Sequence, residues 1–129
     1  MGLDAPISVG DLIDRITILE IKIDRIADAT KRANVQFELD GLAAVAMNGV
    51  AMTAELARLK AELRSVNEVL WDVEDKLRIL ERDKRFDEEF VDHARSVYKT
   101  NDERAALKRA INEAVGSEIV EEKSYAKYE

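Results

Sequence analysis

Apolar residues recur at alternating spacings of four and three from Met52 to Leu80, without a missed position. The pattern is carried by Met52, Leu56, Leu59, Leu63, Val66, Leu70, Val73, Leu77 and Leu80. An alternation held over about four heptads is typical of the seam of a coiled coil rather than of an ordinary surface helix. It predicts one long helix that buries a continuous apolar stripe against a second helix.

A run of the same kind precedes it and predicts that second helix. Its apolar positions are Leu12, Ile16, Leu19, Ile23 and Ile26, followed less cleanly by Thr30, Ala33 and Phe37. Ser8 is a suitable N-cap for this helix, and Asn48-Gly49 is a strong turn signal. We expect the helix to continue to Met47 and the chain to reverse at the turn, although residues 38–51 could instead form a loop. The two helices would then make a long antiparallel, coiled-coil-like hairpin over about residues 8–84.

Surplus apolar surface predicts that one end of this hairpin is covered. Ile18 and Ile21 lie off the seam early in the first helix, and Trp71 and Ile79 lie off it late in the second. An antiparallel hairpin brings these two places to the same end, where exposed apolar side chains would form an adhesive patch. We therefore expect the rest of the chain to pack over this end.

The C-terminal third offers that cover. Apolar residues between Phe86 and Tyr98 form one helical stripe, and residues 100–103 form a capping box that starts another helix. Gly116 is a suitable stop, and the sequence leaves open whether the tail over residues 117–129 is ordered. We therefore predict a single all-α domain over residues 1–129, in which two or three short helices within residues 86–129 cap the hairpin.

Composition excludes several classes of protein. The 129 residues include 27 acidic and 20 basic side chains, a net charge of −7, and no cysteine. The chain therefore has no disulfide and no cysteine-ligated metal, and its charge disfavours nucleic acid as a partner. Its longest uncharged stretch, Gly41 to Thr53, is too short to span a membrane, and residues 1–10 lack the pattern of an export signal. We expect a soluble, cytoplasmic protein of bacterial type.

A cluster of cations around residue 100 is the candidate binding site. These cations surround the N-terminus of the helix that is predicted to start there. Free backbone N–H groups and flanking cations together suit a phosphate or a carboxylate group. Nearby side chains could stack on or contact a sugar or nucleotide, and two carboxylates could act as a base or a metal ligand. The candidate ligand-binding residues are Trp71, Asp72, Asp75, Arg95, Tyr98, Lys99, Asn101, Arg104 and Lys108. The alternative is that the cations pair with carboxylates of the hairpin and only orient its cover.

The remaining motifs give weaker evidence for a metal site or a catalytic site. The Asp-x-x-Asp pairs Asp11/Asp14 and Asp72/Asp75 have the spacing of a helical Mg²⁺ site, but no Glu-x-x-His motif accompanies them. His93 is the only histidine, and no serine or cysteine nucleophile motif goes with it. The chain has no phosphate-binding loop and no dinucleotide fingerprint. The sequence therefore predicts no catalytic residue, no metal site and no cofactor, and it favours a binding module over an enzyme.

The middle of the hairpin predicts self-association. Between about residues 28 and 65 the two helices have no predicted cover, so that alone they bury little surface. A second copy of the chain could complete a four-helix arrangement there. Residues 43–52 also form an apolar tip that suits contact with another protein. We therefore predict a homodimer or a complex with a partner protein.

Four segments of the chain resemble a family of small bacterial helical proteins of unknown function. The segments are Ser8–Leu19, Val66–Asp75, Ala94–Arg104 and Val120–Tyr125, and their Leu-Trp-Asp and Asn-Asp-x-Arg-Ala motifs are fairly specific. Members of that family occur near, or fused to, glycosyltransferase-like proteins of cell-surface polysaccharide biosynthesis. The resemblance implies a sugar phosphate, a nucleotide sugar or a glycosyltransferase as the partner, and it carries over no catalytic residue.

Two functional hypotheses follow from the sequence. The first is a non-enzymatic interaction or accessory protein, with the link to surface-polysaccharide biosynthesis that the resemblance implies. The alternative is a small-ligand-binding or enzymatic pocket for a phosphorylated sugar or nucleotide at the capped end of the hairpin.

Overall fold

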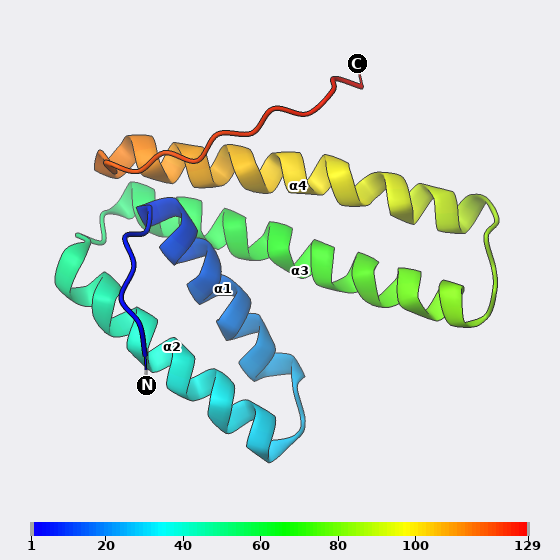
Figure 1. Ribbon diagram of the computed structural model, residues 1–129, viewed down its shortest axis with the longest axis horizontal. Helices are drawn as coiled ribbons and strands as arrows, with labels where there is room; N and C mark the ends of the chain where they lie inside the picture. The colour runs from blue at the N-terminus through cyan, green and yellow to red at the C-terminus, as the bar shows by residue number, and fades with distance from the viewer. Residues whose placement is uncertain (1, 129) are drawn as a thin grey trace.

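The computed structural model describes residues 2–128 and folds into four helices joined by short connections (Figure 1). The helices are α1 (Val9–Arg25), α2 (Ala29–Gly49), α3 (Ala54–Arg82) and α4 (Glu88–Val115). No β-strand occurs among the described residues, so the predicted all-α class is confirmed. None of the helices in this part of the chain is long and apolar enough to cross a membrane.

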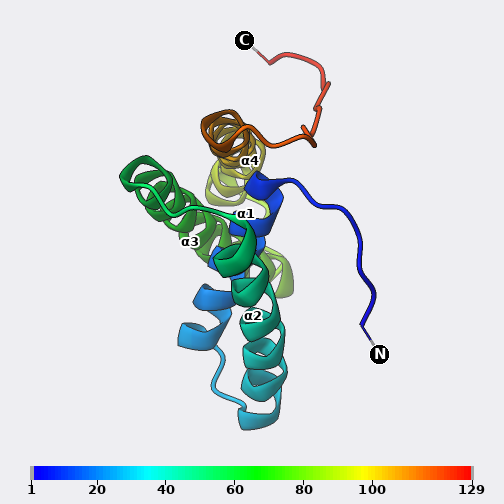
Figure 2. The same ribbon diagram turned by 90° about the vertical axis from the view of Figure 1, so that its left-hand side faces the viewer.

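The four helices pack as a long pair crossed by a shorter one. Helices α3 and α4 run antiparallel to each other, and α1 packs against both of them. Helix α2 turns back along α1 and lies on the side of the molecule away from α4 (Figures 1 and 2). Since α2 returns the chain to where α1 began, α1 and α3 run in the same general direction, from left to right in Figure 1.

The predicted hairpin over residues 8–84 is wrong because its first helix is interrupted and forms two helices. Helix α1 ends at Arg25, where Ile26 adopts extended backbone, and Asp28 caps the start of α2 by accepting a hydrogen bond from the Lys31 N–H at 2.9 Å. An N-cap aspartate satisfies an otherwise free N–H and thereby makes a new helix start favourable, although the apolar spacing continues across the break. The prediction that residues 38–47 are helical is confirmed, and the second reversal follows Gly49, close to the predicted turn.

The predicted cap of two or three short helices over residues 86–129 is also wrong. Residues 88–115 form the single helix α4, and the supposed capping box at Thr100 lies in its interior, where Thr100 is buried. No glycine or proline interrupts this stretch, so nothing in the backbone forces a break. The true N-cap is Asp87, and Gly116 ends the helix as predicted, with the positive φ of 66° that favours glycine.

The core confirms the first half of the predicted seam of α3, except that Met52 precedes the helix and is 55% exposed. Buried apolar side chains from three helices meet in one cluster, namely Leu12, Ile13, Ile16, Leu56, Leu59, Leu63 and Ile111. Helix α1 is central and buries residues around most of its circumference, whereas no residue of α2 is buried. The start of α1 sits so close to α4 that a Cβ atom on Gly10 would lie 2.4 Å from the carbonyl oxygen of Lys108.

Candidate functional site

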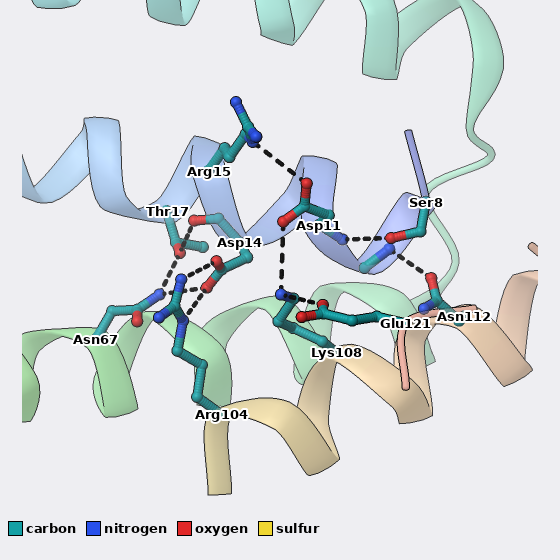
Figure 3. Close-up of polar contacts among 11 residues, drawn as sticks. Ser8, Asp11, Asp14, Arg15, Thr17, Asn67, Arg104, Lys108, Asn112 and Glu121 are labelled. Carbon is teal, nitrogen blue, oxygen red and sulfur yellow. Dashed lines mark hydrogen bonds and ion pairs between the residues drawn. The ribbon is translucent and has the colours of Figure 1, made fainter. Parts of the chain in front are cut away.

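A buried carboxylate joins three helices at the centre of the molecule (Figure 3). The side chain of Asp14, on α1, is 1% exposed and accepts hydrogen bonds from Arg104 of α4, from Nε at 2.9 Å and from Nη2 at 2.5 Å. Asn67 of α3 donates from Nδ2 to Asp14 Oδ1 and to Thr17 Oγ1, both at 2.9 Å. The Thr17 hydroxyl donates in turn to the carbonyl of Asp14 at 2.7 Å. We call these four residues the Asp14 network.

The electrostatics of the Asp14 network favour a charged pair. The hydrogen bond to Asp14 raises the pKa of Arg104 above its ordinary value, although partial burial of the guanidinium acts in the opposite direction. No buried side-chain nitrogen or oxygen among residues 2–128 lacks a hydrogen-bond partner. The network therefore holds the guanidinium of Arg104 in one position with its charge compensated.

A groove of about 430 Å³ opens beside Arg104. Its lining comes from α1, α3 and α4 and consists of Ile18, Ile21, Asn67, Leu70, Trp71, Glu74, Asp75, Arg78, Asn101 and Arg104. We call this the Trp71 groove. Trp71 is half-buried, and the guanidinium carbon of Arg25 lies 5.8 Å from the centre of its ring. The groove thus combines an apolar surface and an aromatic ring with two guanidinium groups, two amides and two carboxylates.

The tail after α4 forms a second hollow, of about 690 Å³, which we call the tail groove. Residues 117–128 are not helical and run back along α4 (Figure 1). Lys108 Nζ lies 2.6 Å from Glu121 Oε2, and Asp102 accepts hydrogen bonds from Lys123 at 2.9 Å and from the Tyr128 hydroxyl at 2.8 Å. These two donors lower the pKa of Asp102.

Lys108 bridges the start of α1 and the tail. Its ammonium group lies 3.4 Å from Asp11 Oδ1 in addition to its contact with Glu121 (Figure 3). Asp11 also pairs with Arg15 one turn along α1. The charge of Lys108 is therefore already shared between two carboxylates of the protein itself.

The structure brings together some of the nine candidate residues and separates the others. Trp71, Asp75, Asn101 and Arg104 line the Trp71 groove, and Tyr98 and Lys108 join Asn101 and Arg104 in the tail groove. The other three, Asp72, Arg95 and Lys99, are exposed and line neither groove.

The two Asp-x-x-Asp pairs do not converge. Asp14 belongs to the buried network, whereas Asp72 is exposed and pairs with Arg25 of α1. Among the described residues no group of three or more histidine, aspartate and glutamate side chains is placed to hold a metal ion. His93 lies one turn from Glu89 on α4, with 4.0 Å between His93 Nε2 and Glu89 Oε1.

Sequence reasoning missed the partners that shape the site. It treated Asp14 as one member of a surface pair and gave no role to Asn67 or Arg78. A signal was present for Asp14, because Ile13, Ile18 and Ile21 extend the apolar surface of this helix beyond the single face that carries Leu12 and Ile16. The helix N-terminus that was expected to hold a phosphate at residue 100 does not exist, since α4 runs through this point.

We expect the tail to loosen when its charge pairs are screened. Its contacts with α4 are mostly exposed ion pairs, each worth about 0–1 kcal/mol, and at about 1 M salt the Debye length falls to about 3 Å. Heteronuclear NOE values of residues 119–128 should therefore fall at high salt while those of α4 stay constant. Asp102→Asn should produce the same change at low salt, because it removes the charge that holds Lys123. A tail that stays equally rigid in all three conditions would contradict this interpretation.

Comparison with known proteins places the chain in a family but assigns it no activity. No curated protein and no solved structure matches it. Residues 3–128 match DUF6165, which is described as a family of unknown function, so the expected resemblance to such a family is confirmed. Because the match covers almost the whole sequence, the chain belongs to the DUF6165 family.

Proposed function

We propose that this chain is a non-enzymatic accessory protein that binds an anionic, ring-bearing small molecule in the Trp71 groove. The observation that carries the proposal is the placement of Arg104. Its side chain is 30% exposed and lines the groove, yet Asp14 fixes its guanidinium through two nitrogens. The third nitrogen, Nη1, makes no hydrogen bond to any described residue, so it remains available for a ligand. A donor that is already immobilised loses little conformational entropy when it binds an anion.

The remaining lining supports a sugar phosphate or a nucleotide. Ile18, Ile21 and Leu70 supply apolar surface, and the ring of Trp71 offers a face on which a sugar or base can stack. Arg78 provides a second guanidinium, while the amide of Asn101 and the carboxylate of Asp75 suit hydroxyl groups. A volume of about 430 Å³ is near the lower end for ligand sites, which favours a small molecule over a polymer.

Binding is favoured over catalysis by the residues present. The described lining of the groove contains no histidine and no serine or threonine, and Glu74 is paired with Arg78. The Thr17 hydroxyl nearby is used within the Asp14 network. The link to cell-surface polysaccharide biosynthesis stays part of this proposal, and it makes sugar phosphates and nucleotide sugars the first compounds to test.

A fluorescence titration tests the proposal directly, because Trp71 is the only tryptophan. Titration with a panel of sugar phosphates and nucleotide sugars should give a saturable change in its emission for at least one compound. Arg78→Gln and Asn101→Ala should weaken this binding at least tenfold, since each removes a polar group of the groove. The matched control is Glu81→Gln, which changes an exposed carboxylate of α3 outside the groove and should leave binding unchanged.

A second readout separates binding from a local effect on the tryptophan. A ligand that binds only the folded chain raises the melting temperature, and the stabilisation grows with the logarithm of the ligand concentration above the Kd. The same compounds should therefore stabilise the protein thermally, and the stabilisation should be lost in Trp71→Leu. If no compound of the panel changes either emission or melting temperature, or if Glu81→Gln impairs binding as much as Arg78→Gln, the proposal is wrong.

A further inference from the structure

Helix α2 carries two apolar stripes on opposite sides. The inner stripe packs on the core through Leu39, Leu42, Ala46 and Val50. The outer stripe follows the same three-and-four spacing and consists of Thr30, Ala33, Phe37, Gly41 and Ala44, all exposed. A helix that is apolar on both sides is normally covered on both, and here only one side is covered.

The outer stripe includes the most exposed aromatic ring of the helices. Phe37 is 84% exposed, and Met47 beside the stripe is 83% exposed. In the predicted hairpin Thr30, Ala33 and Phe37 were expected to face the second helix. The break at residues 26–28 instead turns α2 so that these residues face away from the core, and no described residue covers them.

We propose that the outer stripe of α2 binds the same stripe of a second copy of this chain, with the two helices antiparallel. The first reason is size complementarity. A two-fold axis between Asp40 and Gly41 sets Phe37 of each copy opposite Ala44 of the other, so that the large ring meets a small side chain twice. A parallel pair in register would instead place the two phenylalanines opposite each other, and it would leave unfilled space between the two alanines.

Charge complementarity gives the second reason. Helix α2 has Lys31 and Arg32 in its first turn and no basic residue in its last turn. Antiparallel pairing sets the first turn of one α2, which carries these cations, level with the C-terminus of the other α2, whose free carbonyl groups carry partial negative charge. Parallel pairing would instead place the four cations together, and like charges would oppose it.

The proposed contact between the two α2 helices is short. With 21 residues α2 is about 30 Å long, which makes the contact shorter than those of many obligate dimers. Association should therefore depend on protein concentration. Asp40 lies near the two-fold axis at the edge of the stripe, so that two negative charges approach each other there. Replacing Asp40 by asparagine should tighten the dimer several-fold.

Sedimentation equilibrium and one charge substitution test the interface. The mass of the wild-type chain should rise with concentration toward twice 14.6 kDa. Phe37→Glu should weaken association at least tenfold, because it places a charge in the centre of the contact. Val91→Glu is the matched control, since Val91 is 48% exposed on α4 and should not alter association. A chain that stays monomeric at its highest soluble concentration, or a dimer that survives Phe37→Glu, would overturn the proposal.

Disulfide cross-linking tests the direction of pairing, because the chain contains no cysteine. An added Cβ at Gly41 meets no atom within 4 Å, so Gly41→Cys is compatible with the fold. Antiparallel pairing predicts that Gly41→Cys forms a covalent dimer under mild oxidation, whereas Ala33→Cys does not. Cross-linking by both variants would indicate parallel pairing and contradict the antiparallel dimer, as would the absence of any cross-link. Neither experiment uses a ligand, so its outcome is independent of binding in the Trp71 groove.

Discussion

Asp14→Ala is expected to lower the free energy of unfolding by about 3 kcal/mol. The substitution leaves Arg104 and Asn67 without the acceptor that joins α1 to α4 and α3. Breaking a buried ion pair typically costs about 3–5 kcal/mol, and the lower end applies because the Arg104 side chain is 30% exposed and can still reach water. Urea unfolding followed by far-UV circular dichroism measures the loss, which is a large fraction of the usual stability of a small domain.

A matched substitution on the same helix separates burial from charge. Asp11 also forms ion pairs, with Arg15 and Lys108, but its side chain is 30% exposed, so Asp11→Ala should cost less than about 1 kcal/mol. In the double variant Asp14→Leu with Arg104→Met, no unpaired charge remains, and the loss should be smaller than the sum of the two single losses. Equal losses for Asp14→Ala and Asp11→Ala would show that the Asp14 network does not hold the helices together.

The helical class and the seam of α3 could be predicted because both depend on residues close in the sequence. Leu56, Leu59 and Leu63 repeat at the spacing of one helix face, and all three are buried as expected. The end of α4 at Gly116 is equally local, since the positive φ there suits glycine. Such features depend on the local sequence and can be predicted without knowing how the helices pack.

The arrangement of the helices could not be predicted in the same way. The apolar spacing continues, though less cleanly, across residues 26–28, so it does not distinguish one long helix from two helices joined by an N-cap at Asp28. Tertiary packing decides between them, because the buried residues of α1 cover more than one face and this helix packs against three other helices. Ile13 and Ile21 lie off the seam of the predicted hairpin, and both are buried in the structure.

The sequence identified some residues of the candidate site, but the structural reason it gave for selecting them was wrong. Arg104 and Asn101 were selected as flanking groups of a helix N-terminus, whereas the structure places them in the middle of α4 beside Trp71. Their meeting with Trp71 required α3 and α4 to be antiparallel over their length, and residue spacing within one helix does not specify this. The partner Asp14 is remote in sequence from Arg104, so only the folded arrangement reveals the pair.

Gly10→Ala is expected to lower the free energy of unfolding by about 2 kcal/mol. The added Cβ would lie 2.4 Å from the carbonyl oxygen of Lys108, and a backbone atom cannot move aside as a flexible side chain can. Separating α1 from α4 to relieve this overlap would also stretch the 2.7 Å hydrogen bond from the Gly10 N–H to Asn112 Oδ1, worth about 1 kcal/mol. Alanine's better helix propensity recovers at most about 1 kcal/mol, so the net effect stays unfavourable.

Gly41→Ala provides the matched control, and the two variants should differ in sign. Gly41 lies inside α2, and a Cβ added there meets no atom within 4 Å. Only the gain in helix propensity then acts, which should raise the free energy of unfolding by about 0.5–1 kcal/mol. Urea unfolding at low protein concentration compares both variants with the wild type without interference from self-association. Since alanine is at least as good a helix former as glycine at both positions, a loss of stability at Gly10 must come from what surrounds the new methyl group. If both variants were stabilised, α1 would not approach α4 as closely as Gly10 allows.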